Sequence, residues 1–77
     1  MHYTYVLKSF KDCLHYVGFT HNLKERFRKH QAGKVQSTKS RRPLSLEYYE
    51  AFAVEELARI QEKFYKTGQG RRILRKN

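Results

Sequence analysis

The sequence predicts a single α/β domain: a small, mainly antiparallel sheet of three strands flanked by helices. Apolar side chains alternate in three short segments, which is typical of half-buried strands. They recur every three or four residues in two longer segments, which is typical of amphipathic helices. The 77 residues suffice for one compact domain with a modest core. The expected order is strand, strand, helix, strand, helix, helix, with the last helix short.

The first two strands are expected to form an antiparallel hairpin. Residues 3–8 and 14–19 are rich in β-branched and aromatic side chains, and a Lys-Asp pair between them suits a turn. Because side chains alternate between the two faces of a strand, matched faces would put Tyr5 and Tyr16 on one surface. The side chains expected to point to the core are Val6, Val17 and Phe19.

Capping signals bound the first helix. Asn22 precedes Glu25 at the spacing of a capping box, and Gly33 follows the last expected residue, Ala32, as a C-terminal stop. The sequence therefore predicts a helix that begins after Asn22 and runs to about Ala32.

The faces of this helix separate apolar from polar side chains. Leu23 and Phe27 are four residues apart and are expected to be buried. Arg26 and His30, also four apart, lie on a neighbouring face. An ordinary solvated helix surface would explain the last two equally well, because most charged helix residues face water.

The second half of the chain predicts a basic loop, a strand and two helices. Residues 34–43 are polar and basic, 44–52 alternate as a strand, 53–67 have helical spacing, and 70–76 suit a short basic helix. The expected buried stripe of the longer helix contains Ala53, Leu57, Ile60 and Phe64.

The charge balance indicates a polyanionic partner. Seventeen Lys and Arg against seven acidic residues give a net charge of +10, and a field of that sign attracts nucleic acid. A well-solvated surface or a ribosomal-type binding protein would have the same composition. Cys13 is the only cysteine, so no intrachain disulfide is expected, and no segment is apolar enough for a membrane span or signal peptide. The expected location is the cytoplasm.

An ordered series of short motifs suggests a family. Tyr3-Thr4-Tyr5 is followed after eleven residues by Tyr16-Val17-Gly18, and then by Arg26 and His30. This series resembles the GIY-YIG nuclease superfamily, and most of all its small standalone bacterial proteins. Thr4 and Tyr3 depart from the family's Ile and Gly, but the tyrosine of the first signature is kept. Two later stretches extend the resemblance, residues 37–43 and 58–68.

The resemblance implies a metal-dependent endonuclease that hydrolyses DNA. The side chains expected at its catalytic centre are Tyr5, Tyr16, Arg26, His30 and Glu62. In the family one Mg²⁺ or Mn²⁺ binds the glutamate and contacts the scissile phosphate, a tyrosine accepts a proton, and the arginine supports the phosphorus. A nearby metal or Arg26 would favour the tyrosine's phenolate. His30 is the next proton carrier, since imidazole titrates near pH ~6.5. The family's later Asn has no clear counterpart other than Asn77.

Basic side chains outside this centre are expected to bind DNA phosphates. Such contacts position a substrate without reading its sequence, and no base-reading module is apparent, so cleavage should be structure-selective or weakly sequence-specific. Gly18 closes the second signature, where a side chain would crowd the site. The expected nucleic-acid contacts are Gly18, Lys34, Lys39, Arg41, Arg42, Arg71 and Arg72.

Simpler interpretations remain for the same residues. The two tyrosines would fit as half-buried strand aromatics, and Glu62 as a surface partner of Lys66 one helical turn later. Two functional alternatives follow. One is a basic module that binds DNA or RNA without cutting it. The other is a nuclease domain that acts only with a protein partner.

Overall fold

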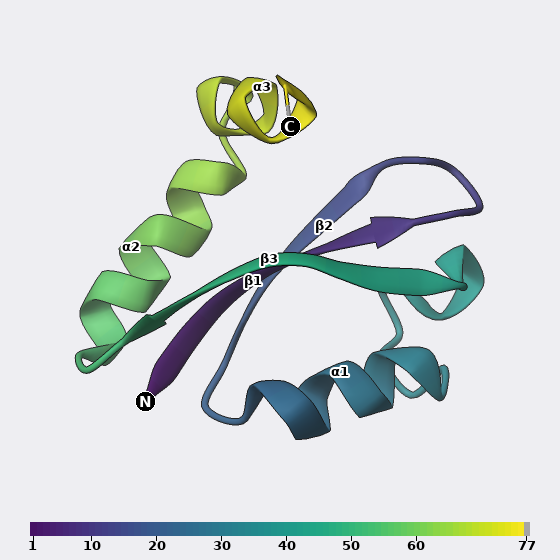
Figure 1. Cartoon of the computed structure of the whole chain (residues 1–77), viewed down its shortest axis with the longest axis horizontal. Helices are drawn as coiled ribbons and strands as arrows, with labels where there is room; N and C mark the ends of the chain where they lie inside the picture. Colours follow the sequence, from purple (N-terminus) through teal and green to yellow (C-terminus); the bar gives the residue numbers. More distant parts are fainter. Residues whose placement is uncertain (77) are drawn as a thin grey trace.

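The computed structural model describes residues 1–76 and contains one three-stranded sheet with three α-helices (Figure 1). Asn77, considered above as a counterpart of the family's Asn, lies outside the described residues. The predicted α/β class and the order β-β-α-β-α-α are confirmed. The elements are β1 (His2–Ser9), β2 (His15–Thr20), α1 (Leu23–Gln31), a 3₁₀ turn η1 (Lys39–Arg41), β3 (Leu44–Phe52), α2 (Glu55–Tyr65) and α3 (Gly68–Lys76).

Strand β1 lies at the centre of the sheet, between β2 and β3, and both pairings are antiparallel. The β1–β2 register pairs Tyr5 with Gly18. In the turn of this hairpin, the backbone N–H of Leu14 donates to Asp12 Oδ1 at 2.9 Å. Cys13 adopts a left-handed conformation with φ of 61°. The predicted hairpin is therefore present, with a strained residue in its turn.

The sheet carries one apolar cluster on each face. Val6 and Val17 pack with Tyr65 of α2 and Leu74 of α3. On the opposite face, Tyr5, Leu7 and Leu44 form the second cluster, against which Leu23 and Phe27 of α1 pack partly buried. The expectation that Tyr5 and Tyr16 share a face holds, because both belong to this second cluster. The face that carries the two tyrosines is also part of the hydrophobic core, because α1 packs against it.

The boundaries of α1 follow its predicted signals. Asn22 Oδ1 accepts a hydrogen bond from the backbone N–H of Glu25 at 3.2 Å. Gly33, just beyond the C-cap, has φ of +76°, a conformation that favours glycine. The predicted helix and both of its ends are confirmed.

The predicted buried stripe of α2 is wrong. Leu57 and Ile60 are 50% and 55% exposed, Ala53 is also exposed and Phe64 only partly buried, whereas Ala58 and Tyr65 are buried. The small Ala58 allows the helix backbone to approach β1 closely, and its carbonyl accepts a hydrogen bond from Thr4 Oγ1. This contact and the packing of Tyr65 set which face of α2 lies against the sheet, and that face does not contain Leu57 and Ile60. Within residues 1–76, no helix is both long and apolar enough to cross a membrane.

Candidate active site

Tyr5 is the buried centre of the candidate site. Its ring lies over Gly18 of the neighbouring strand: a Cβ atom at Gly18 would lie 2.4 Å from both Cζ and Oη of the tyrosine. No side chain fits at that distance, so the glycine is what allows the phenol to cross β2. Only 1% of Tyr5 is exposed. The predicted crowding at Gly18 is therefore crowding by Tyr5.

A buried hydrogen-bonded chain fixes the orientation of this phenol. Tyr5 Oη lies 2.8 Å from Nε2 of His30. On the other side of the imidazole, Nδ1 lies 2.8 Å from Oγ1 of Thr38. His30 and Thr38 are both 0% exposed, so the interpretation of His30 as part of a solvated helix surface is wrong. Because both imidazole nitrogens are engaged, His30 links the strand to the basic loop.

Burial dominates the protonation of this chain. Desolvation raises the pKa of Tyr5 to about 12, and the neighbouring Arg26 opposes this increase without cancelling it. Desolvation also lowers the pKa of His30 to about 4, with a smaller contribution from Arg26. Both groups are therefore neutral near pH 7. The expectation that Arg26 favours the phenolate gives the right sign for its own effect, but for Tyr5 burial outweighs it.

Arg26 and Glu62 come from opposite helices and both act on the Tyr5 phenol. The charge of Arg26 lowers the pKa of Tyr5 and the charge of Glu62 raises it. Arg26 belongs to α1, which packs on the Tyr5 face of the sheet, whereas Glu62 belongs to α2, which packs on the other face. Its side chain is only 18% exposed.

The carboxylate of Glu62 already has a cationic partner. Its Oε2 accepts a hydrogen bond from Lys66 Nζ at 2.9 Å, one helical turn later. The simple interpretation of Glu62 as an ion-pair partner therefore describes a real contact. The role of Glu62 as a metal ligand, which the family resemblance implies, would require the metal ion to displace this ammonium group.

Tyr16 is the more accessible phenol. Its ring centroid lies 6.4 Å from that of Tyr5 and 5.3 Å from that of His30. Its hydroxyl accepts a long hydrogen bond, 3.4 Å, from Ser37 Oγ in the basic loop. Tyr16 is half-buried, unlike Tyr5. The two tyrosines are therefore adjacent but not equivalent, since only Tyr16 reaches the surface.

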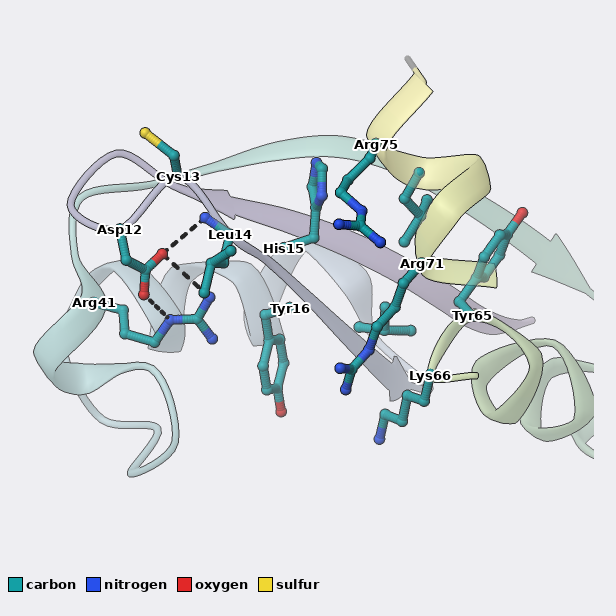
Figure 2. A pocket seen from close by; sticks show the side chains of 12 residues that line it. Asp12, Cys13, Leu14, His15, Tyr16, Arg41, Tyr65, Lys66, Arg71 and Arg75 are labelled. Carbon is teal, nitrogen blue, oxygen red and sulfur yellow. Dashed lines mark hydrogen bonds and ion pairs between the residues drawn. The ribbon is translucent and has the colours of Figure 1, made fainter. Parts of the chain in front are cut away.

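A basic pocket of about 530 Å³ adjoins these residues, between the β1–β2 turn and α3. Figure 2 shows the side chains of Tyr16, Lys66 and Arg71 projecting toward the same side of the molecule. Arg75 and His15 also line the pocket. Four cationic side chains thus gather beside Tyr16, namely Arg41, Lys66, Arg71 and Arg75.

The predicted phosphate-binding residues divide into exposed and structurally engaged ones. Arg41 is ion-paired with Asp12 at 2.8 Å, which fastens the loop to the hairpin turn. Arg42 donates to the backbone carbonyls of Lys39 and Gln31. Arg71 lines the pocket. Of the remaining predicted contacts, Gly18 is buried against the Tyr5 ring. The other three are exposed and outside the pocket: Lys34, Lys39 and Arg72.

Sequence reasoning missed several residues that shape the site. Thr38 and Ser37 belong to a loop that seemed only basic and polar, and nothing in their spacing reveals contacts with His30 and Tyr16. Lys66 and Arg75 were visible as basic residues. Their place beside Tyr16 depends on how α3 folds back over the hairpin.

The residues present fit a hard divalent cation. Mg²⁺ and Mn²⁺ prefer oxygen ligands, and Mg²⁺ is commonly held by one or two carboxylates with water and substrate phosphate completing the coordination. Glu62 supplies one such carboxylate, and the ammonium group of Lys66 now supplies the positive charge beside it. The residues described therefore offer one carboxylate, that of Glu62, for such an ion, and the other ligands would have to be water and substrate oxygens.

Comparison with known proteins identifies the family. The GIY-YIG catalytic domain model matches residues 1–75. A UPF0213 protein of Bacillus pumilus is 43% identical over 67 residues, covering 86% of this chain and 67% of the relative. A UPF0213 protein of Staphylococcus haemolyticus is 42% identical over 67 residues, covering 86% and 80%. One from Streptococcus pyogenes serotype M3 is 43% identical over 65 residues, covering 83% and 70%. No solved structure gives a significant match. The chain therefore belongs to the GIY-YIG catalytic domain family.

Proposed function

We propose that this domain is a divalent-metal-dependent endonuclease that cuts DNA phosphodiester bonds, with structure-selective or weakly sequence-specific action. The observation that carries the proposal is the packing of Tyr5, Tyr16 and His30 against one another, with Tyr5 Oη 2.8 Å from His30 Nε2. Phosphodiester hydrolysis needs a cation on the phosphate, a carboxylate to hold a metal ion, and a group that accepts the proton of water. Family membership adds the nuclease reaction class.

We assign the roles by accessibility. Tyr16 reaches the surface, so it can lose its own proton to solvent, and its phenolate oxygen then accepts the proton of the attacking water and becomes a phenol again. Tyr5 is buried and protonated, and it acts with His30 as a positioning pair. Arg26 is half-buried, and its charge acts on both Tyr5 and His30. Its guanidinium binds the scissile phosphate. When bound at Glu62, Mg²⁺ or Mn²⁺ supplies Lewis-acid stabilisation of the phosphate charge.

The basic pocket beside Tyr16 is the proposed path of the DNA backbone. Lys66, Arg71 and Arg75 line it together, and such cations position phosphates without reading bases. The net charge of +10 supports the same partner. Exposed Lys34, Lys39 and Arg72 would extend the contacts outward, whereas Arg41 acts mainly through its ion pair with Asp12.

Cleavage assays with matched variants test this proposal. Branched, nicked and linear DNA are incubated at low salt with Mg²⁺, Mn²⁺ or EDTA. We expect metal-dependent products, and losses of about 100-fold or more for Arg26→Ala and Glu62→Gln, the scale of removing one transition-state contact. Arg28→Ala and Glu56→Gln are the matched controls, because both residues are exposed on the same two helices.

The alternative functions predict different results. A binding module retains DNA in a salt-sensitive way and gives no metal-dependent products. A domain that needs a partner binds DNA but cuts only after a cell fraction is added, and the added activity still requires Arg26 and Glu62. Products that persist in both variants would indicate a contaminating nuclease.

A further inference from the structure

Three potential metal ligands gather at one end of the sheet, away from the residues used above. His2 begins β1, His21 follows β2, and Glu55 begins α2. Antiparallel pairing brings the start of β1 beside the end of β2, with Tyr3 opposite Thr20. Figure 1 shows the N-terminus, the β2–α1 connection and the start of α2 at the same end of the molecule. Ligand atoms from the three side chains all lie within 4.8 Å of one another.

Aromatic packing holds the two imidazoles in place. Phe19 stacks with His2 at 6.3 Å between ring centroids and meets His21 edge-on at 5.1 Å. The ring centroids of the two imidazoles, His2 and His21, are 4.7 Å apart. The guanidinium of Arg59 also packs on Phe19, 4.2 Å from its ring centroid. The cluster is therefore an ordered part of the fold.

One nitrogen in the cluster lacks a partner. His2 Nδ1 is buried and makes no hydrogen bond within the described chain. Buried polar atoms are normally paired, so such an atom requires a reason. The contact between His21 Nε2 and Glu55 Oε1, at 3.8 Å, is a surface ion pair of small value. It leaves the imidazole of His2 unexplained.

We propose that His2, His21 and Glu55 form a second cation site, selective for a late first-row divalent metal such as Zn²⁺. Two imidazoles and one carboxylate are a ligand set that suits Zn²⁺ rather than Mg²⁺, which prefers oxygen alone. With metal–ligand bonds of about 2.1 Å, tetrahedral ligand atoms are about 3.4 Å apart. His21 and Glu55 have side chains that are 61% and 46% exposed, so they can close the remaining gap without repacking the core.

The neighbouring Arg59 orients one ligand. Its Nε donates to Glu55 Oε2 at 2.9 Å, which leaves Oε1 directed toward His21. Outer partners of this kind hold a metal-binding carboxylate in place. The site is separate from the proposed nuclease metal, because Glu55 and Glu62 are seven residues apart on α2, about 10 Å along a helix. A metal ion here would connect the start of β1, the turn after β2 and the start of α2.

Calorimetric titration of the full chain, without an affinity tag and after EDTA treatment, tests the site with Zn²⁺ alone. We expect one ion per chain and a rise in melting temperature on binding. His2→Ala and His21→Ala should each weaken binding by at least about tenfold, since even loss of an outer partner weakens metal sites by 10–100-fold. His15→Ala and Glu62→Gln are the controls and should bind Zn²⁺ normally.

Two results would overturn the proposal. One is the absence of Zn²⁺ binding to the unaltered chain. The other is unchanged binding in His21→Ala, which removes a side chain that is 61% exposed. Zn²⁺ binding that depends on Glu62 instead would also contradict it, because the ion would then occupy the proposed nuclease centre. None of these results depends on DNA cleavage.

Discussion

The buried imidazole of His30 predicts that mild acid destabilises the fold. In the folded protein burial lowers its pKa to about 4, whereas an unfolded chain has the ordinary value of about 6.5. Between these two pH values the unfolded chain binds a proton that the folded protein excludes. Stability is therefore complete above about pH 6.5 and falls as the pH decreases toward 4. Protonation would also deprive one imidazole nitrogen of its role as acceptor from Tyr5 or Thr38.

The size of this effect follows from the difference between the two pKa values. Each pKa unit corresponds to about 1.4 kcal/mol, so linkage gives a loss of about 2.5 kcal/mol between neutral pH and about pH 4.5. A domain of this size has a total stability of about 5–10 kcal/mol. The carboxyl groups with lowered pKa values, Asp12 and Glu55, contribute mainly at lower pH. The window from 6.5 to 4.5 thus reports chiefly on His30.

Urea denaturation at a series of pH values measures the loss. We expect the free energy of unfolding to fall steadily across this window in the unaltered protein, and much less in His30→Gln, which carries no titrating group there. Because His30→Gln also loses contacts, a second measurement follows the imidazole directly by NMR. An unchanged free energy between pH 6.5 and 4.5, or an imidazole signal of His30 that titrates above pH 6, would refute the buried neutral assignment.

Three further substitutions test separate features. Gly18→Ala places a Cβ atom 2.4 Å from the Tyr5 ring, so the free energy of unfolding in urea should fall by about 2–3 kcal/mol. A loss below about 0.5 kcal/mol, the size expected for a surface substitution, would contradict the close approach. Cys13→Gly relieves a φ of 61° and should raise the same free energy by up to ~1 kcal/mol; a decrease would count against backbone strain in the turn. Lys66→Met removes the cation on Glu62 and should strengthen Mn²⁺ binding in calorimetry, whereas equal or weaker binding would show that Lys66 does not compete with the metal.

The sequence predicted the elements better than their faces. Strands and helix ends follow from local rules, so the Asn22 cap, the Gly33 stop and the hairpin could all be anticipated. The buried side of α2 could not, because Leu57 and Ile60 have good apolar spacing yet are exposed. What decides the orientation of that helix is a tertiary contact, the closeness of Ala58 to β1, which no helical period encodes.

The candidate site divides in the same way. Motif spacing and family resemblance selected Tyr5, Tyr16, Arg26 and Glu62, and matched strand faces placed the two phenols together. The resemblance did not indicate that Tyr5 would be 1% exposed and Tyr16 half-buried. That difference arises because β1 is the central strand and β2 an edge strand. The position of each strand in the sheet, rather than residue type, distinguishes the two tyrosines.

The difference in exposure between Tyr5 and Tyr16 bears on how so small a domain could bind a phosphate at its surface. The buried chain from Thr38 through His30 to Tyr5 is neutral and fully paired at neutral pH, so it can be rigid without an unpaired charge. The charged groups of the proposed centre, Arg26 and Glu62, are both partly exposed. Deleting the Tyr5 hydroxyl should therefore disturb the geometry of Arg26 more than it removes a proton carrier. Tyr5→Phe should lower cleavage without moving its pH profile, while Tyr16→Phe should abolish it; a shifted pH profile in Tyr5→Phe would reverse the two assignments.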